Sequence, residues 1–467
     1  MKRFIAPLSV AVVLVTSQAS GQQSEASRFT AIDSMMRTEM SRTRTPGAQI
    51  AIVERGRLVY TKGYGVADIE TGRPITDRTL FQSGSLAKLF TGMLLAQLAS
   101  GGTLDMHAPA SRYIPEIAGR GVGASTAHEL LTHSAGWVAG GVPYGRSDEA
   151  AMDALHRTVG DSMLVPGLRG IYSYSNPSFS MAAYIGERAA GRPFETLMDS
   201  LLLRPLGMRL STHRPMVAMT YDVAVGYTRA NDSAASRAVR PMPGNSAEWG
   251  AGFLYTNAAE TARLAMAMMA GGMLEGRRVL AADAIRAVTT GYVGRGESPV
   301  ERVGYGMNSD TVDNHRIWQK GGSVDGYRAL LTMWPSEQFA VAIFVNQASD
   351  LTYQATAKAA RMIAGIATSS MFSDQIATTG RDATAAERAE LAGVYRQMRR
   401  TFELKDVNGR LERITAASAP VVMTGRDRFV VRQPNGDFIQ YQVVRDSVGG
   451  IAYLFSGTTS FPRVRNP

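Results

Sequence analysis

The sequence predicts an α+β protein: an antiparallel sheet flanked by helices, a helical lobe beside it, and a small all-β domain at the C-terminal end. Strand-like patterns occur at 47–66 and return at 327–346, and the stretch between, about 105–295, is mainly helical with long loops. After residue 387, short β-branched and aromatic runs alternate with turns. Because strand-rich segments stand at both ends of the helical insertion, we expect those ends to share one sheet, with a cleft between sheet and lobe.

The first elements are a hairpin and a buried helix. Ile50 to Val53 and Leu58 to Tyr60 form two strand-like runs, and Gly56 marks the turn between them. Apolar residues then recur at helical spacing until Gly101-Gly102 ends the helix; they are Leu86, Leu89, Phe90, Met93, Leu94 and Leu98. Since this helix lacks a polar face, we expect it to be buried on most sides.

Later elements lead back to the sheet and then to the tail. The patterns predict helices over 193–203, 258–269 and about 353–366, and strands over 327–334 and 339–346. Residues 28–366 are therefore expected to form the main domain. Residues 367–386 are rich in Ser, Thr, Ala and Asp and are interpreted as a linker, and residues 387–467, with an Asn435-Gly436 turn signal, as the small β domain.

The N-terminal residues 1–21 have the pattern of a signal peptide. Lys2 and Arg3 precede an apolar stretch from Phe4 to Val15, and small and polar residues follow. A retained anchor is the alternative, but the apolar stretch is short for a span, which needs about 20 residues. We therefore expect an exported protein, periplasmic or secreted, with no stable membrane span after signal cleavage.

The chain contains no cysteine, so it has no disulfide, no thiolate nucleophile and no cysteine-bound metal. Its formal net charge is +10, but the basic residues are dispersed. The densest cluster, Arg396 with Arg399 and Arg400, lacks interleaved aromatic residues, which argues against nucleic-acid binding. Most cations are arginine, so the few lysines suggest positions where a group must be able to lose its proton.

Ser85 and Lys88 form an S-x-x-K pattern at the start of the apolar helix. Residues i and i+3 lie on one helix face, so the lysine amine can reach the serine hydroxyl. A serine needs a nearby base to become a nucleophile, and burial lowers the pKa of a lysine. A helix cap with a surface lysine is the alternative, but a surface lysine is out of place on so apolar a helix.

Two further motifs carry polar groups suited to this chemistry. Tyr174-Ser175-Asn176 lies in a loop, where the tyrosine can relay a proton and the asparagine can hold a substrate amide or carbonyl. Lys320-Gly321-Gly322-Ser323 is expected as a glycine turn before the strand near Tyr327, where the glycines allow a substrate backbone to approach and the lysine can bind a carboxylate. Taken alone, the first motif could be a loop tyrosine that packs its ring, and the second could be a glycine turn at the start of a strand.

Together, S-x-x-K, Y-x-N and K-G-G resemble the three-part signature of the serine β-lactamase and penicillin-binding-protein superfamily. The Y-x-N form is similar to class C β-lactamases, D,D-peptidases and related esterases. Two further segments, Leu130 to Gly136 and Pro205 to Met208, resemble the family's L-L-T-H-x-S-G and P-L-G-M stretches. The resemblance spans about residues 28–366 and implies the β-lactamase/transpeptidase-like fold.

The resemblance also implies roles for individual residues. Ser85 would be the acylated nucleophile, with Lys88 or Tyr174 as the base, a choice the sequence leaves open. The backbone N–H groups of Ser85 and Ser323 would form the oxyanion hole. The substrate would be held by Asn176, Lys320, Gly321 and Gly322. Gly321 departs from the family's usual threonine or serine, which disfavours efficient β-lactam hydrolysis, whereas Lys320 favours a substrate with a carboxylate.

No metal or organic cofactor is expected. His128 and His133 are spaced i and i+5, whereas a zinc-binding H-E-x-x-H needs i and i+4 on one helix face. The sequence thus predicts a serine hydrolase that forms an acyl-enzyme on an amide or ester: a D-amino-acid peptide, a small ester or a β-lactam. A non-catalytic penicillin-binding-like sensor on the same fold is the alternative, and the oligomeric state stays open.

Overall fold

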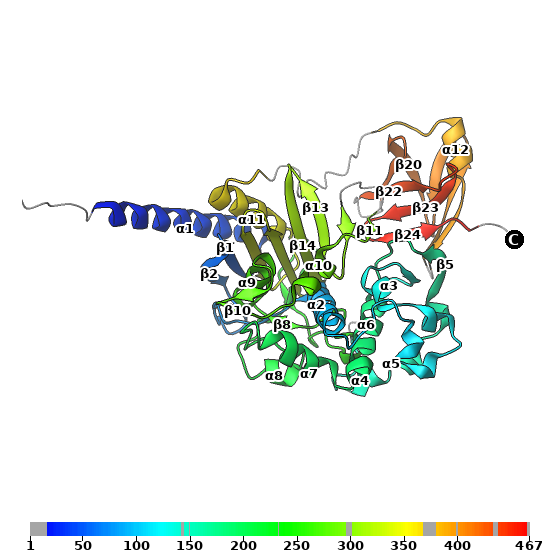
Figure 1. The fold of residues 1–467 in the computed structure, drawn as a ribbon. Coiled ribbons are helices and arrows are strands. Elements are labelled where there is room, and N and C mark those ends of the chain that lie inside the picture. Colours follow the sequence, from blue (N-terminus) through cyan, green and yellow to red (C-terminus); the bar gives the residue numbers. More distant parts are fainter. Residues whose placement is uncertain are drawn as a thin grey trace, which may run out of the picture.

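A computed structural model of the chain describes residues 16–141, 144–148, 150–231, 233–295, 301–367, 380–397, 400–432 and 438–464, with side chains from residue 27 onward. Figure 1 shows two bodies: a large α+β domain with a central sheet, and a smaller β domain packed beside it. The expected α+β class with a C-terminal β domain is confirmed. The residues around the Asn435-Gly436 turn and most of the signal-peptide stretch lie outside the described residues.

The central sheet joins the two strand-rich ends of the main domain. Its order is β11-β12-β13-β14-β15-β16-β1-β2, and every neighbouring pair is antiparallel. β1 (Gly47–Glu54) pairs with β16 (Phe339–Val345), so strands about 290 residues apart lie side by side, as expected. The other strands are β2 (Arg57–Gly65), β11 (Val293–Gly294), β12 (Arg302–Val303), β13 (Asn308–Val312), β14 (His315–Val324) and β15 (Tyr327–Trp334).

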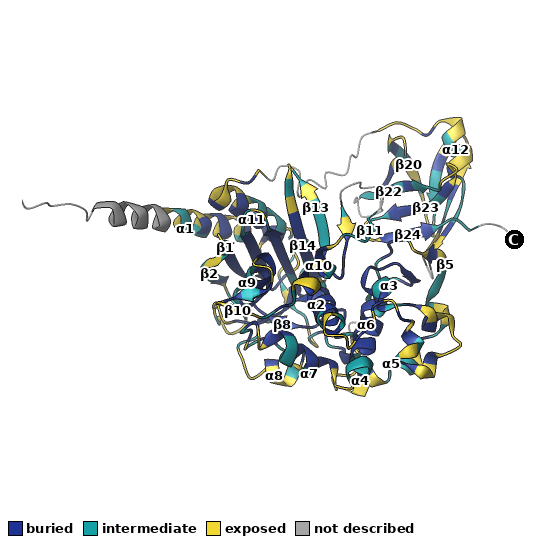
Figure 2. Ribbon diagram, in the orientation of Figure 1, coloured by how far each residue is buried: buried dark blue, intermediate teal, exposed yellow. Residues whose placement is uncertain are grey.

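Helices cover both faces of this sheet. One face packs on α1 (Thr16–Thr43), α11 (Leu351–Ala359) and the π-helical turn that extends α11 to Ala364, through a cluster that includes Ile32, Ile50 and Leu351. The other face packs on α9 (Ala258–Met269), and the same core continues through α2 (Ala87–Ser100), α6 (Asn176–Ala190) and α10 (Ala282–Thr289). The middle strands of the sheet, β1, β15 and β16, are almost wholly buried, whereas its edge strands are partly exposed (Figure 2).

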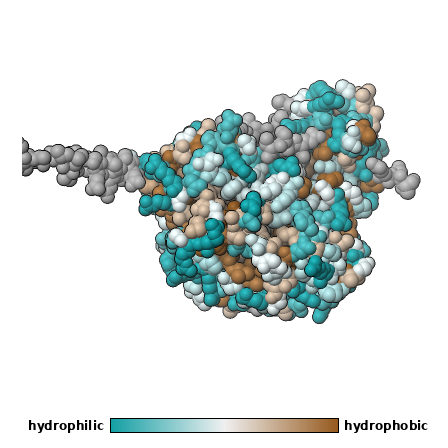
Figure 3. Space-filling view, in the orientation of Figure 1, coloured by the Kyte–Doolittle hydropathy of each residue, from teal (hydrophilic) through white to brown (hydrophobic). Residues whose placement is uncertain are grey.

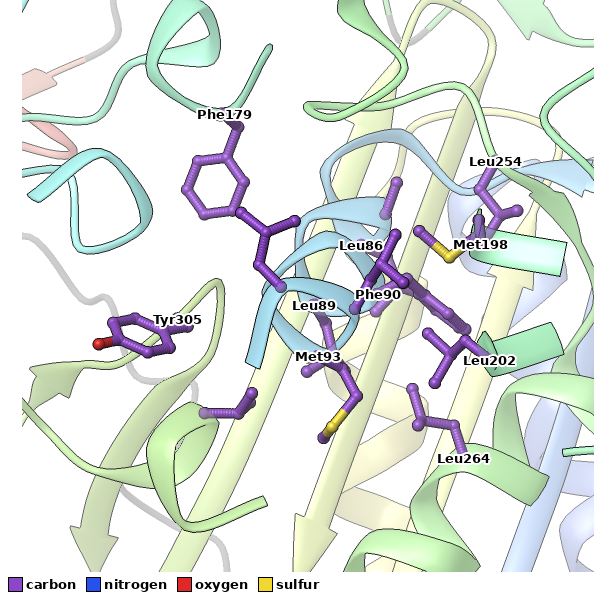
Figure 4. Packing of buried hydrophobic residues seen from close by; sticks show 14 of the residues in the cluster. Leu86, Leu89, Phe90, Met93, Phe179, Met198, Leu202, Leu254, Leu264 and Tyr305 are labelled. Carbon is purple, nitrogen blue, oxygen red and sulfur yellow. The ribbon is translucent and has the colours of Figure 1, made fainter. Parts of the chain in front are cut away.

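Helix α2 is the hub of the larger core, which confirms the expectation of a helix buried on most sides. Its side chains point outward in several directions to elements from across the domain (Figure 4). Leu86, Leu89 and Phe90 are all fully buried, against residues that include Phe179 of α6 and Leu264 of α9. Because the N-terminal end of α2 is locked by this packing, the residues at its first turn have a fixed position.

The helical lobe consists of short pieces rather than long helices. α7 (Phe194–Met198) continues as a π-helical turn over Asp199–Leu203, within the expected helix. The other helices are α3 (Ala127–Leu131), α4 (Ala150–Asp153), α5 (Leu155–Thr158) and α8 (Pro215–Ala218). Short strand pairs join them: β3 (Phe81–Gln82) with β8 (Tyr255–Thr256), β4 (Ala135–Trp137) with β5 (Leu164–Arg169), β6 (Tyr227–Thr228) with β7 (Arg237–Ala238), and β9 (Met273–Leu274) with β10 (Arg277–Arg278).

The C-terminal domain is an up-and-down meander of eight strands that closes on itself. A bridge from Tyr395 to Arg463 and a hydrogen bond from Val464 N–H to the Val394 carbonyl join its two ends, and aromatic rings such as Phe402 and Tyr441 fill it. Its strands are β17 (Gly393–Gln397), β18 (Arg400–Val407), β19 (Arg410–Ile414), β20 (Ser418–Gly425), β21 (Arg428–Arg432), β22 (Phe438–Arg445), β23 (Ile451–Ser456) and β24 (Thr459–Pro462). We call this domain the barrel.

Three details differ from the sequence-based expectations. Lys320 to Ser323 do not form a turn but lie within β14, and the turn comes later at Asp325-Gly326, where Gly326 has a φ of +87°. The expected linker over 367–386 already contains the start of α12 (Ala385–Leu391), because Thr384 and Glu387 form a capping box. Helix α1, which precedes the first strand, was not foreseen, although Ile32 and Met36 pack fully buried against the sheet.

Hydrophilic residues are distributed over the whole visible face of the molecule (Figure 3). Many arginines are paired with carboxylates, including Arg28 with Glu54 and Arg188 with Glu116. In the described part of the chain, no helix combines the length and the apolar character needed to cross a bilayer.

Candidate active site

Ser85 lies in a single turn of 3-10 helix that precedes α2, at the edge of a cavity. This turn, η1 (Gly84–Leu86), starts where Ser83 N–H binds the Leu254 carbonyl, and Gly84 takes a φ of +52° that favours glycine. Gly84 also has no room for a side chain, because a Cβ there would lie 2.6 Å from the backbone nitrogen of Ser323. The serine turn and β14 are therefore in direct backbone contact.

Lys88 is fully buried one turn further along, and it faces Ser85. Its Nζ lies 3.3 Å from Ser85 Oγ, 2.6 Å from Asn176 Oδ1 and 2.7 Å from the Ala251 carbonyl. Burial, and then the nearby positive charge of Lys320, lower the pKa of Lys88 well below its usual value. The site therefore favours a neutral amine at this position.

Tyr174 and Asn176 are positioned by the start of α6. Ser175 is the N-cap residue, and its hydroxyl accepts a hydrogen bond from Ser178 N–H, with Pro177 in the first turn. This cap directs the Tyr174 hydroxyl to Ser85 Oγ, to which it donates at 2.7 Å. Burial raises the pKa of Tyr174, so the phenol holds its proton.

His133 supports this segment and was not assigned a role from the sequence. Its Nδ1 accepts the Ser175 N–H at 3.0 Å, and its carbonyl accepts the Ser173 N–H at 2.9 Å. The ring lies against Tyr174 with the centroids 4.4 Å apart. Burial, with the nearby Lys320 and Lys88, lowers the pKa of His133, so the imidazole is neutral and can accept this bond. The L-L-T-H stretch contained the signal, but in the sequence His133 was considered only as a zinc ligand and set aside.

Lys320 is also buried, and its Nζ lies 5.4 Å from the centroid of the Tyr174 ring. Burial, aided by the charge of Arg295, lowers the pKa of Lys320 to about 7. The two glycines that follow face opposite sides of β14. A Cβ on Gly322 would lie 2.8 Å from Ser85 N and 2.5 Å from Leu86 N, whereas one on Gly321 would lie 3.4 Å from the Tyr353 hydroxyl.

A cavity of about 220 Å³ opens in front of Ser85. Ser85, Asn176 and Ser323 line it, so it brings together parts of the three sequence motifs. Glu248 also lines it, and its negative charge opposes the lowering of the Lys88 pKa. Sequence reasoning gave this glutamate no role, because a single carboxylate in a loop has no distinctive pattern. In the parts of the chain that the structure describes, no group of three or more His, Cys, Asp or Glu side chains could hold a metal ion.

A family model described as Beta-lactamase matches residues 32–365. The chain belongs to the beta-lactamase family. It is 30% identical over 202 residues to a β-lactamase of Pseudomonas fluorescens, which covers 41% of this chain and 54% of that protein. It is also 30% identical over 197 residues to esterase EstB of Burkholderia gladioli, covering 38% of this chain and 50% of that protein. The chain thus spans about half the length of these curated relatives.

Solved structures share this fold over all or most of the chain. SurE superposes with a TM-score of 0.75 at 24% identity and covers 94% of this chain and 100% of that one. The D-alanine carboxypeptidase AmpC of Burkholderia cenocepacia superposes with a TM-score of 0.61 at 24% identity, over 73% of this chain and 99% of that one. The curated relatives of this beta-lactamase-family chain therefore include a β-lactamase and an esterase, and a D-alanine carboxypeptidase shares its fold.

Proposed function

We propose that this beta-lactamase-family protein is an exported serine hydrolase that cleaves an amide or ester through an acyl-enzyme on Ser85. One observation carries the proposal: Ser85 Oγ lies within hydrogen-bond reach of both the buried Lys88 amine and the Tyr174 hydroxyl, at the edge of a cavity. In this proposal Ser85 is the nucleophile and the two groups beside it supply the base and the proton donor that acyl transfer needs.

Lys88 is our proposed base for the first step. A neutral amine has two N–H donors and one lone pair. The two shortest contacts of Lys88 Nζ are to carbonyl oxygens, Asn176 Oδ1 and the Ala251 carbonyl, which can accept a hydrogen bond but cannot donate one. These two contacts therefore use both N–H donors of the neutral amine. The lone pair is then left for the longest contact, the Ser85 hydroxyl at 3.3 Å. Tyr174 is less suited to this role, because its raised pKa keeps it a phenol.

In the proposed reaction Lys88 takes the Ser85 proton while Oγ forms a bond to the substrate carbonyl carbon. The Ser85 and Ser323 N–H groups receive the negative charge of the tetrahedral oxygen, a contribution of about 3 kcal/mol per donor. When the carbon–leaving group bond breaks, Tyr174 gives its proton to the departing amine or alkoxide and regains one from the Lys88 ammonium. Water then repeats the sequence on the acyl-Ser85 ester, which frees the acid and restores the serine.

The substrate classes that fit are a D-amino-acid peptide of cell-wall type, a small ester or a β-lactam. Protonated Lys320 beside Tyr174 is suited to binding a substrate carboxylate. Gly321 supplies no hydroxyl to assist it, which favours a peptide or an ester over efficient β-lactam turnover. The related β-lactamase, esterase and carboxypeptidase support this range without selecting one member.

The test is intact-mass measurement after incubation with a fluorophosphonate probe and, separately, with a penicillin. We expect a fluorophosphonate adduct on the wild type and none on Ser85→Ala. Ser180→Ala is the matched control, because Ser180 is a buried serine on α6 without a hydrogen-bond partner among the described residues. The lifetime of any penicilloyl adduct distinguishes slow from rapid turnover. A folded wild type that forms no adduct with either reagent would favour the non-catalytic sensor instead.

Export and the domain limits belong to the same proposal. We propose that residues 1–21 are removed as a signal peptide, that 28–366 form the hydrolase domain, and that 387–467 form the barrel after a linker over 367–386. N-terminal sequencing of protein produced with its own leader tests the first point. A mature chain that starts near residue 22 is expected, and a chain that still starts at Met1 in the exported fraction contradicts it.

A further inference from the structure

The barrel contacts the segment that carries Tyr174 at three consecutive residues. Each contact is a hydrogen bond, and together they involve β17, β24 and the turn before β24. In chain order they join Ser460 Oγ to the Tyr172 carbonyl at 2.8 Å, Gln397 Nε2 to Ser173 Oγ at 2.9 Å, and the Tyr174 N–H to the Thr458 carbonyl at 2.9 Å. These partners are separated by more than 220 residues in sequence.

Two of these bonds are buried, whereas the third accepts at Thr458, an exposed residue of the barrel turn. The side chain donors are buried, with Ser460 at 0% exposure and Gln397 at 2%. Beside them the ring of Tyr172 packs against Phe455 in a cluster that also holds Val303 and Tyr453. A buried hydrogen bond that loses one partner leaves the other without water to replace it, so the bonds of Ser460 and Gln397 constrain the segment.

The main domain holds the same segment from the other side. Ser173 N–H and Ser175 N–H both bind His133, at its carbonyl and at its ring. The N–H between them, that of Tyr174, binds the barrel at Thr458. The backbone position of Tyr174 is therefore set jointly by the two domains.

The same barrel turn also binds Arg295, a residue of the main domain whose charge acts on Lys320. Gly457, adjacent to Thr458 in the turn between β23 and β24, accepts a hydrogen bond from Arg295 Nη2 at 3.1 Å. Arg295 is the charge that, after burial, lowers the pKa of Lys320. A single turn of the barrel thus binds both the backbone of Tyr174 and the arginine whose charge acts on Lys320.

We infer that the barrel is a working part of the active site, and that Ser460 and Gln397 are positioning residues that hold Tyr174 on Ser85. The inference rests on the proposed acyl-enzyme function. The Tyr174 hydroxyl donates to Ser85 Oγ at 2.7 Å, and a hydrogen bond weakens steeply with misalignment. A small shift of the Tyr174 backbone would therefore weaken this contact. Misplacing a catalytic group by about 1 Å can cost about a hundredfold in rate.

The test compares Ser460→Ala and Gln397→Leu with Ser456→Ala in the full chain. Ser456 is a matched control, because it is also a serine of the β23–β24 hairpin that donates to a carbonyl at 2.8 Å, but its partner, Gln440, lies within the barrel. Turnover of p-nitrophenyl butyrate and the rate of fluorophosphonate labelling are measured well below every Tm. We expect kcat and the labelling rate to fall about ten- to a hundredfold in the double variant Gln397→Leu/Ser460→Ala, with KM within about twofold, and to stay near wild type in Ser456→Ala.

The outcomes separate this inference from the function on which it rests. A wild type that is not labelled by fluorophosphonate overturns the proposed function. A labelled wild type whose double variant reacts as fast as Ser456→Ala overturns the positioning role. Equal losses of rate in the double variant and in Ser456→Ala, in proportion to lost Tm, also overturn it, because the serines would then act only on barrel stability.

Discussion

Gly322→Ala should damage the site by forcing β14 away from the serine turn. The glycine has no positive φ, so its backbone can accept alanine, and the effect must come from space alone. The added Cβ would lie 2.5 Å from Leu86 N and 2.8 Å from Ser85 N, and closer still to the Ser83 carbonyl oxygen. All three atoms are backbone, so none can move aside by changing a rotamer.

The size of the effect follows from these distances. Real Cβ atoms do not approach other atoms within 3.0 Å, so strand and turn must separate by at least about 0.5 Å at Leu86, and by more at Ser83. The proposed oxyanion donors, Ser85 N–H and Ser323 N–H, lie on opposite sides of this contact. Removing one donor of such a pair costs about 10²- to 10³-fold in kcat, and a misaligned donor loses much of its contribution because hydrogen bonds weaken steeply with angle.

The assay is fluorophosphonate labelling at 25 °C, with Tm measured in parallel. The control is Gly321→Ala, one residue away on the opposite face of β14, where the nearest atoms to the new Cβ are the Tyr353 hydroxyl at 3.4 Å, Leu330 Cδ1 at 3.6 Å and the Ala329 carbonyl oxygen at 3.8 Å. We expect a loss of about a hundredfold or more in Gly322→Ala and less than about threefold in Gly321→Ala. Equal labelling rates in the two folded variants would refute the reasoning.

Three further changes test other parts of the site. Lys88→Met should lower turnover by at least about a hundredfold, as expected for loss of a general base. The control Lys62→Met removes a half-exposed lysine that is paired with Asp33, and it should leave turnover unchanged. Similar losses of turnover in both variants would refute the assignment. His133→Ala should lower the free energy of unfolding in urea by about 1–3 kcal/mol, because the Ser175 N–H loses its acceptor. His133→Asn should lower it less, since asparagine keeps an acceptor and tolerates the φ of +57° at this position. A larger loss in His133→Asn than in His133→Ala would contradict this. Lys320→Met should raise Tm most at pH 7 and below and little above pH 10, and a pH-independent change would contradict the assigned cause.

Much of the fold was predictable because its core elements have regular patterns. The strand over 327–334 and the helix over 258–269 coincide with β15 and α9. The Lys320 motif was misplaced because glycine was read as a turn signal, whereas Gly322 is needed where β14 touches the serine turn. That contact joins residues more than 230 positions apart, and nothing local in the sequence records it.

The candidate site was predictable to the extent that its side chains fall in motifs. Ser85, Lys88, Tyr174 and Asn176 lie within one hydrogen-bonded cluster, although their roles remain proposals. Of the supports, His133 lay in the L-L-T-H stretch without an assigned role, and Thr458 had no signal in the sequence. His133 acts through a ring nitrogen on a backbone N–H, and Thr458 through a main-chain carbonyl, which any residue could supply. Hydrogen bonds to the backbone leave no residue-type signature, so the contribution of the barrel became apparent only in three dimensions.

Burying Lys320 should lower the free energy of unfolding, and the size of this cost should depend on pH. An unfolded lysine binds its proton below about pH 10.5, whereas native Lys320 does so only below about 7. Between these values the unfolded chain binds more protons, so stability rises with pH across this range and is lowest below about pH 7. Each tenfold change in proton affinity is worth about 1.4 kcal/mol, so the full cost approaches 5 kcal/mol as an upper limit. Since Lys320 in turn lowers the pKa of Lys88, the group that destabilises the fold is the one that helps keep the proposed base neutral.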